Sequence, residues 1–255
     1  MRAADEVVGF ASDLIAIDTT NSSDRGGPGT EWAAAEYVAE KLGEVGYEVA
    51  YEESGARGRG NVIARLAGAD PGRGALLVHG HLDVVPADAT EWSVHPFSGE
   101  VRDGYVWGRG AVDMKGTVAM TLAVARQLKR DGVVPPRDLI FAYLADEEAG
   151  GFNGAGWLVD HRPELFEGAT EAISEVGGFS VTAADGARAY LDHLLPALAP
   201  IAESLDCSAE LASLRDIVDR GASYQRQLRV AAAHDGSLKA VVSSLVRELR
   251  EGRPS

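Results

Sequence analysis

Apolar residues recur at two different periods along the first two thirds of the chain. They return every three or four positions over residues 7–15, 32–42 and 116–130, which predicts three amphipathic helices. Thr30 is expected to cap the start of the second helix, and Gly46 to stop it. Between these stretches lie short, nearly continuous apolar runs that predict strands, at residues 47–51, 61–66, 75–79, 138–145 and 171–176.

Helices that alternate with almost wholly apolar strands predict an α/β fold, in which helices cover both faces of an open, mostly parallel sheet. One segment differs, because VRDGYVW (101–107) places Asp103-Gly104 between β-favouring residues and so predicts a hairpin with a two-residue turn. In open parallel sheets the functional site lies just beyond the carboxyl ends of the strands. The polar residues at those ends are therefore the candidates for chemistry.

The last quarter of the chain differs from the rest in composition. Residues 188–255 contain three of the 30 glycines and equal numbers of basic and acidic residues, nine of each, so the net charge of −15 belongs to residues 1–187. Leucine, isoleucine and valine in the last quarter follow helical spacing. We therefore expect two domains, an α/β domain over 1–187 and an α-helical tail over 188–255, with the boundary near residue 185.

Charge and cysteine content exclude several classes of partner. A net charge of −15 would repel the phosphates of nucleic acids and of anionic membranes, so neither is expected as a partner. The N-terminus has acidic residues where a signal peptide needs an apolar run, and no stretch approaches the roughly 20 apolar residues of a membrane span. A cytoplasmic location is expected. Cys207 is the single cysteine, so a metal ion would be held by nitrogen and oxygen ligands.

Polar residues that could bind a metal follow four segments of the predicted fold. One imidazole and several carboxylates that converge at one sheet edge make a ligand set suited to zinc, or to cobalt or manganese in its place. These residues are His81, Asp83, Asp113, Asp146, Glu147, Glu148 and Glu175.

Each of these residues also has a purely structural interpretation. His81 and Asp83 could form an ordinary hydrogen-bonded pair, Asp113 could cap the helix that follows it, and Glu147 and Glu148 could be solvated charges. Glu175 is harder to explain in this way, because a carboxylate at the end of an apolar strand needs a partner. The combination of all of them favours a metal site.

Two histidines, His79 and His81, stand at and just after the end of the strand predicted at 75–79, and their spacing predicts different roles. Asp83 stands two positions after His81, so both side chains point to the same side of an extended segment, where the carboxylate can hold the second imidazole nitrogen. His79 lies one pleat earlier and is expected to be structural.

Four motifs, in this order and spacing, carry a resemblance to a known family. They are GHLDVVP (80–86), GRGAVDMKG (108–116), ADEEAGG (145–151) and SEVGG (174–178). Over about residues 7–182 the chain resembles the co-catalytic zinc metallopeptidases that include aminoacylase, acetylornithine deacetylase, succinyl-diaminopimelate desuccinylase and glutamate carboxypeptidase. The resemblance implies metal-dependent hydrolysis of an amide bond in a dipeptide or an N-acyl amino acid that carries a carboxylate.

The resemblance also implies a role for each matching residue. His81 and Glu175 would bind one zinc ion, Asp113 would bridge two ions, and Glu148 would bind the second. Asp83 would stand behind His81. A cis peptide would follow Asp113.

A general base completes the implied chemistry. In the family pattern this role falls to Glu147, which would take a proton from the attacking water and pass it to the leaving amine.

The chain also departs from the family pattern. Members of the family usually carry an inserted lid and dimerisation domain after the segment that corresponds to residues 179–191, and a resumed catalytic portion that supplies one more histidine ligand. This chain is expected to lack both, with His193 and His234 on helix surfaces, so the two ions would bind with unequal affinity. The tail faintly resembles that of glutamate-cysteine-ligase-like carboxylate-amine ligases. The alternative to an enzyme is therefore a truncated or fused metal-binding fragment without catalytic activity.

Overall fold

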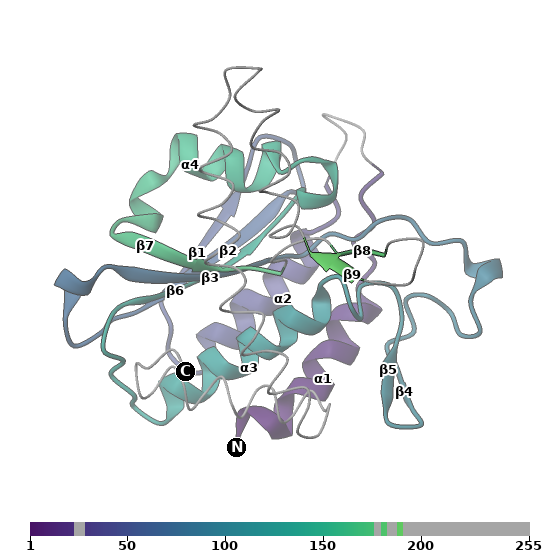
Figure 1. Ribbon diagram of the computed structural model, residues 1–255, viewed down its shortest axis with the longest axis horizontal. Coiled ribbons are helices and arrows are strands. Elements are labelled where there is room, and N and C mark those ends of the chain that lie inside the picture. Colours follow the sequence, from purple (N-terminus) through teal and green to yellow (C-terminus); the bar gives the residue numbers. More distant parts are fainter. Residues whose placement is uncertain (23–28, 176–179, 183–187, 191–255) are drawn as a thin grey trace. The chain divides into compact units, whose positions relative to one another are not determined.

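A computed structural model describes residues 1–22, 29–175, 180–182 and 188–190 (Figure 1). The described residues up to Glu175 belong to one compact unit. In a second unit, strand β8 (Ser180–Thr182) pairs antiparallel with β9 (Arg188–Tyr190). The domain boundary near 185 and the tail expected after it, with His193 and His234, lie outside the described residues or at their margin, so the division at 187 stays a prediction.

The three predicted amphipathic helices are confirmed, with apolar stripes that are buried. They are α1 (Ala3–Ala16), α2 (Trp32–Gly43) and α3 (Lys115–Arg130), and a short helix α4 (Trp157–His161) follows later in the chain. Single turns of 3-10 or π helix are η1 (Pro71–Arg73), η2 (Ala89–Glu91), η3 (Glu147–Ala149), η4 (Phe152–Gly156) and η5 (Pro163–Phe166).

The predicted cap of the second helix is wrong. Glu31 precedes the first residue of α2 and makes no side-chain cap, while the hydroxyl of Thr30 donates instead to the main-chain oxygen of Thr20 at 3.1 Å. A tertiary contact thus replaces the local cap that Thr30 was expected to make. The helix ends at Gly43, and Gly46 takes the left-handed φ of 87° in the turn that follows.

The central sheet has five strands in the order β1-β2-β6-β3-β7. The strands are β1 (Val49–Glu53), β2 (Gly60–Leu66), β3 (Ala75–His81), β6 (Leu139–Leu144) and β7 (Ala169–Ile173). Strand β3 lies parallel to both β6 and β7, whereas β2 is antiparallel to β1 and to β6. The sheet is therefore mixed, and its parallel part is the one that leads to the predicted site residues.

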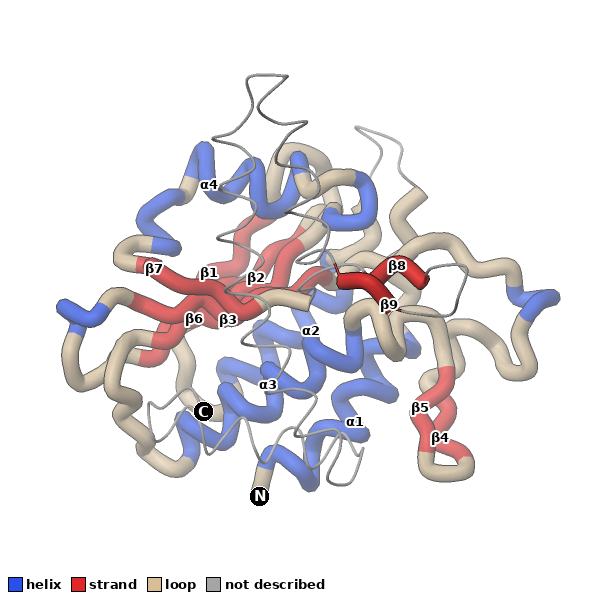
Figure 2. Tube along the Cα trace, in the orientation of Figure 1, coloured by secondary structure: helices blue, strands red, loops and turns tan. Residues whose placement is uncertain are grey.

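Helices cover both faces of this sheet, as predicted. Figure 2 shows α1, α2 and α3 on one face and α4 on the other. On the first face the buried side chains of Leu122 and Val118 share one apolar cluster with Val78 and Phe141. On the second face Leu158 belongs to a smaller cluster with strand residues, Ile63, Ile140, Ala142 and Leu144. Strand β6 is buried along its whole length because it has a packed layer on each side.

The predicted hairpin is present as β4 (Glu100–Arg102) and β5 (Tyr105–Trp107). Its two turn residues both have positive φ, 56° at Asp103 and 81° at Gly104. This is the conformation for which Asp-Gly is favoured in two-residue hairpins.

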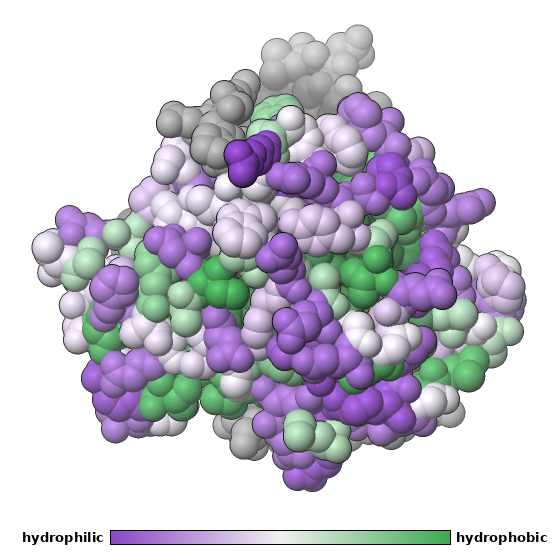
Figure 3. Space-filling view, turned by 180° about the vertical axis from the view of Figure 1, so that it is seen from behind, coloured by the Kyte–Doolittle hydropathy of each residue, from purple (hydrophilic) through white to green (hydrophobic). Residues whose placement is uncertain are grey.

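The surface mixes polar and apolar residues. On the face shown in Figure 3 polar residues separate small apolar areas from one another. Isolated exposed apolar residues, such as Val134, are normal on a folded protein. Among the described residues no helix is long and apolar enough to cross a membrane.

Leu122 offers a test of the helix-to-sheet packing. Its side chain is fully buried in the cluster between α3 and the sheet, so Leu122→Ala is expected to lower the free energy of unfolding by about 2–5 kcal/mol in urea denaturation, through lost transfer energy and a new cavity. The control is Val134→Ala, at a residue that is 66% exposed, where a change within about 0.5 kcal/mol is expected. Equal effects of the two substitutions would contradict the assignment of Leu122 to the core.

Candidate metal centre at the carboxyl edge of the sheet

The parallel strands end together, and this places the candidate residues at one edge of the sheet. His81 is the last residue of β3 and lies opposite Leu144, the last residue of β6. The polar turn 146–148 therefore begins beside His81. Glu175 follows β7 by two residues, on the other side of β3.

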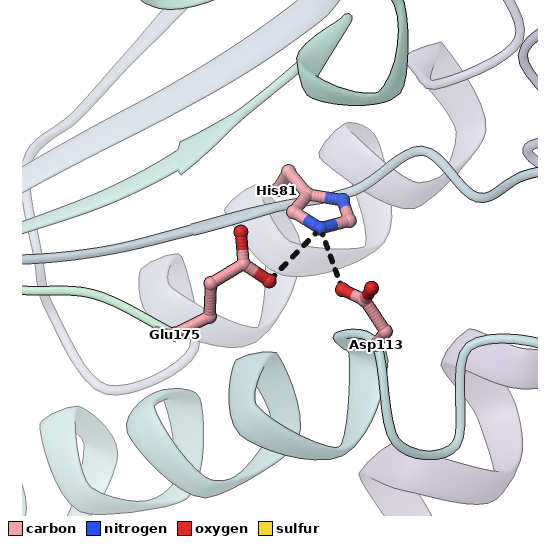
Figure 4. A group of neighbouring side chains, drawn as sticks. All are labelled: His81, Asp113 and Glu175. Carbon is pink, nitrogen blue, oxygen red and sulfur yellow. Dashed lines mark hydrogen bonds and ion pairs between the residues drawn. The ribbon is translucent and has the colours of Figure 1, made fainter. Parts of the chain in front are cut away.

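Three side chains converge at this edge and could hold one metal ion. The imidazole Nε2 of His81 lies 3.0 Å from Oδ1 of Asp113 and 3.4 Å from Oε2 of Glu175 (Figure 4). One ligand atom from each of the three residues lies within 4.8 Å of the other two. An imidazole nitrogen with two carboxylate oxygens is a donor set suited to a divalent ion such as zinc.

The site is buried on one side and open on the other. The side chain of His81 is 2% exposed, whereas that of Asp113 is 65% exposed. The Asp113 carboxylate therefore faces solvent, whereas the imidazole is enclosed.

The charges at this edge favour a cation. Burial opposes protonation of His81, but the hydrogen bond and charge of Asp83 and the charge of Glu175 raise the pKa of the imidazole to about 10. Burial also raises the pKa of Glu175 to about 7, with further contributions from its hydrogen bond to Asp113 and from the charges of Asp113 and Glu147. A positive ion between these groups would relieve the repulsion among the carboxylates, so the residues present fit a divalent metal.

Asp83 contacts Nδ1 of His81, the ring nitrogen other than the one that faces Asp113 and Glu175. The spacing of the two residues predicted that the Asp83 carboxylate would make this contact. The main-chain oxygen of Asp83 lies 2.9 Å from Nδ1 of His81, while the nearer carboxylate oxygen lies 3.5 Å away. With a metal ion bound, the neutral imidazole would keep its proton on Nδ1, and the lone pair of Nε2 would then point toward the ion between Asp113 and Glu175. The main-chain carbonyl, more than the carboxylate, thus fixes the ring.

The carboxylate of Asp83 is bound to the turn that carries the two glutamates. Its oxygens accept the main-chain N–H groups of Glu147 at 3.1 Å and Glu148 at 3.0 Å. Burial alone would raise the pKa of Asp83, but hydrogen bonds from His81 and Asn21 outweigh this effect and lower it. Asp83 therefore stays ionised and links the imidazole to the neighbouring turn.

The two glutamates of this turn differ in position. Oε2 of Glu147 lies 3.8 Å from Nε2 of His81, beside the three converging residues. The carboxylate of Glu148 is not part of the close group found among the described residues. Burial raises the pKa of Glu148, and the charges of Asp113, Asp83 and Glu147 raise it further.

The loop that carries Asp113 leads directly into α3 and is held by Lys115. The peptide between Asp113 and Met114 is cis, as the family resemblance implies. Asp113 does not cap α3, since no side-chain cap is formed there and the helix starts at Lys115. The Lys115 ammonium is buried and donates to the main-chain oxygen of Ile17 at 2.6 Å, and burial lowers its pKa to about 8.

Sequence reasoning missed several buried polar residues around the site. Lys115 lies within the recognised motif at 108–116 but was given no role, and Asn21, Glu31 and Arg59 stand in segments far from every motif. Asn21 donates to the Asp83 carboxylate at 2.8 Å. No local pattern singles out Glu31 and Arg59, because other charged residues such as Glu36 and Arg57 lie nearby in the sequence. His79 is half-buried on β3, and burial lowers its pKa.

Known proteins with similar sequences and folds point to one family. The chain is 37% identical over 161 residues to a succinyl-diaminopimelate desuccinylase of Bradyrhizobium sp. (strain ORS 278), which covers 61% of this chain and 40% of that protein. A second desuccinylase, from Methylorubrum populi, is 40% identical over 135 residues, 51% of this chain and 34% of the relative. Human carnosine dipeptidase 1 has a similar fold, with a TM-score of 0.56 and 25% identity over 67% of this chain and 38% of that one.

The chain thus matches well under half the length of these relatives. A model of the peptidase family M20/M25/M40 matches residues 77–250 and so extends well beyond the boundary expected near residue 185. The family resemblance that rests on the four motifs is confirmed, whereas the faint likeness of the tail to carboxylate-amine ligases stays untested. The motifs at the sheet edge, the fold and this match together place the chain in the peptidase family M20/M25/M40.

Proposed function

We propose that this chain is a zinc-dependent hydrolase that cleaves the amide bond of a small N-acyl amino acid or dipeptide. The single observation that carries the proposal is the group formed by His81, Asp113 and Glu175 at the carboxyl edge of the sheet, with the Glu147 carboxylate beside it. Membership of a peptidase family supports the reaction class.

His81, Asp113 and Glu175 would hold the first ion. The proposed second ion would be held by Asp113, as a bridge, and by Glu148, and cobalt or manganese could replace zinc at both positions. When bound, such an ion supplies Lewis acidity, which polarises the scissile carbonyl and lowers the pKa of water.

Glu147 would act as the general base. Its carboxylate is half exposed and reaches the open side of the site, where it can take a proton from the attacking water and deliver it to the leaving amine. Asp83 would position two of these residues without contacting the substrate. Its main-chain oxygen contacts the imidazole of His81, and its carboxylate accepts the N–H of Glu147.

The proposed substrate class follows from the relatives and from the open side of the site. The names of the relatives indicate a succinylated amino acid in one case and a dipeptide, carnosine, in the other. Both kinds of molecule are small, carry a carboxylate and contain an amide bond. We therefore propose an N-succinyl amino acid or a dipeptide, and a cytoplasmic setting as the sequence predicts.

The first prediction concerns metal binding. His81→Ala should lower zinc affinity by more than about 100-fold in a calorimetric titration, because even residues that only orient metal ligands are worth about 10–100-fold. The control is His95→Ala, which removes an exposed histidine outside the group and should leave the affinity unchanged. If both variants bind zinc as the unaltered chain does, the metal site is placed wrongly.

The second prediction concerns the general base. Glu147→Gln should lower kcat for an N-succinyl amino acid by about 10²–10⁴-fold, since general base catalysis contributes about that much, while zinc affinity stays unchanged. Glu171→Gln is the matched control, because its side chain is 55% exposed against 53% for Glu147, and it should retain full activity.

These measurements also separate the enzyme from the alternative of a silent metal-binding fragment. Zinc binding without turnover of any N-acyl amino acid or dipeptide by the unaltered chain would support the fragment. Turnover that survives in Glu147→Gln would instead disprove the role of Glu147.

A further inference from the structure

A network of buried charged side chains lies directly behind the turn that carries Glu147 and Glu148. Its centre is Arg59, whose side chain is 3% exposed. Nη1 of Arg59 lies 2.6 Å from Oε1 of Glu31 and 3.3 Å from Oδ1 of Asp146. Nη2 donates to the side-chain oxygen of Asn21 at 3.4 Å. One guanidinium thus contacts three buried polar side chains from three separate segments.

The network reaches the turn at Asp146. The main-chain N–H of Asp146 donates to Oε1 of Glu31 at 3.2 Å, and its carboxylate pairs with Arg59 and accepts the N–H of Asn153 at 2.8 Å. Asp146 has a positive φ of 68°, which is uncommon for a residue other than glycine and needs support from its surroundings. This conformation turns the chain at the end of β6 and sets the direction of the next two residues.

A second route from Arg59 to the same turn passes through Asn21. The side-chain amide of Asn21 donates to Oδ2 of Asp83 at 2.8 Å and to Oδ1 of Asp146 at 3.2 Å. Asp83 in turn accepts the N–H groups of Glu147 and Glu148. Both routes end on the turn, the first at Asp146 and the second at the N–H groups of Glu147 and Glu148.

The arrangement places several buried carboxylates around one guanidinium. Glu31 and Asp146 pair with Arg59 directly, and Asp83 is one amide group away. Buried carboxylates repel one another and are costly to desolvate unless a cation and hydrogen bonds offset this cost. Arg59 supplies the charge, and its planar fork supplies two donors in fixed directions, which an ammonium group cannot do.

We propose that Arg59, held by Glu31, is a positioning residue for Glu147 and Glu148: it fixes Asp146 and Asn21 and thereby the direction of both glutamates. Arg59, Glu31 and Asn21 all precede residue 77, where the match to the family model begins. The catalytic meaning of this role rests on the proposed function, whereas its structural part, the order of the turn, does not.

The test uses Arg59→Lys in the full chain, which keeps the positive charge and removes the fork. Hydrogen exchange of the Glu147 and Glu148 amides should become at least about 10-fold faster, because these amides lose their fixed acceptor. With zinc present, kcat for an N-succinyl amino acid should fall about 10–100-fold with KM within about threefold, since small misplacement of reacting groups costs about this much. Zinc affinity at His81, Asp113 and Glu175 should stay within about threefold, because Arg59 reaches His81 only through Asn21 and Asp83, and the ring is held there by the main-chain oxygen of Asp83.

The control is Arg126→Lys, at another buried arginine that pairs with carboxylates, Glu6 and Glu44, near the C-terminal end of α3 and so at the other end of this helix from Asp113. It should lower the free energy of unfolding as Arg59→Lys does, but leave the exchange of the two amides and kcat unchanged. A merely structural role for Arg59 would make the two variants alike in all these measurements, and that result would overturn the proposal.

A milder variant covers the case in which Arg59→Lys does not fold. Glu31→Gln keeps the shape of the side chain but removes the negative charge that pairs with Arg59. Faster hydrogen exchange of the Glu147 and Glu148 amides is expected. Unchanged exchange in Glu31→Gln would overturn the proposal in that case. If the unaltered chain hydrolyses no substrate, the proposed function fails, while amide exchange still decides whether Arg59 orders the turn.

Discussion

The ionised, fully buried carboxylate of Asp83 is the interaction on which the site depends. It accepts hydrogen bonds from the main chain of Glu147 and Glu148 and from the side chain of Asn21, while its own main-chain oxygen meets the imidazole of His81. A buried carboxylate is stable only when such donors replace its lost hydration. Because three donors from two distant segments meet this carboxylate, the position of Asp83 ties those segments to the end of β3.

The sheet provides the second constraint. Strands β3 and β6 are parallel, and their last residues, His81 and Leu144, lie opposite each other. The residues that follow the two strands therefore begin side by side. The antiparallel strands β1 and β2 extend the sheet beyond β6, so that β6 has a neighbouring strand along each edge and is buried along its length. The apolar clusters on the two faces then hold the strand ends rigid, and this rigidity is what a metal centre requires of its ligands.

Burial divides the site into a fixed part and an accessible part. His81 and Asp83 are enclosed, and their hydrogen bonds leave them little freedom. Asp113 and Glu147 reach the solvent-exposed side, where a substrate can approach. The ion pairs of Arg59 with Glu31 and Asp146 continue the enclosed part of the site behind the turn that carries Glu147 and Glu148.

The sequence alone determined the order and type of the main elements, the hairpin turn at Asp103-Gly104 and the candidate residues at the strand ends. These features rest on local periodicity, on turn chemistry and on motifs that lie close together along the chain. It did not determine the antiparallel side of the sheet or the cap of α2, because both depend on which distant segment lies alongside. The role of Thr30, for example, was decided by the main-chain oxygen of Thr20.

The tertiary structure alone decided how the site is supported. It brought Asn21, Glu31 and Arg59 behind Asp83 and Asp146, and it made the main-chain oxygen of Asp83 the closer partner of His81. Hydrogen bonds and ion pairs between residues 28 to 125 positions apart, as between Glu31 and Arg59 or between Asn21 and Asp146, leave no periodic trace in a sequence. Their energy depends on burial and distance, which exist only once the chain has folded.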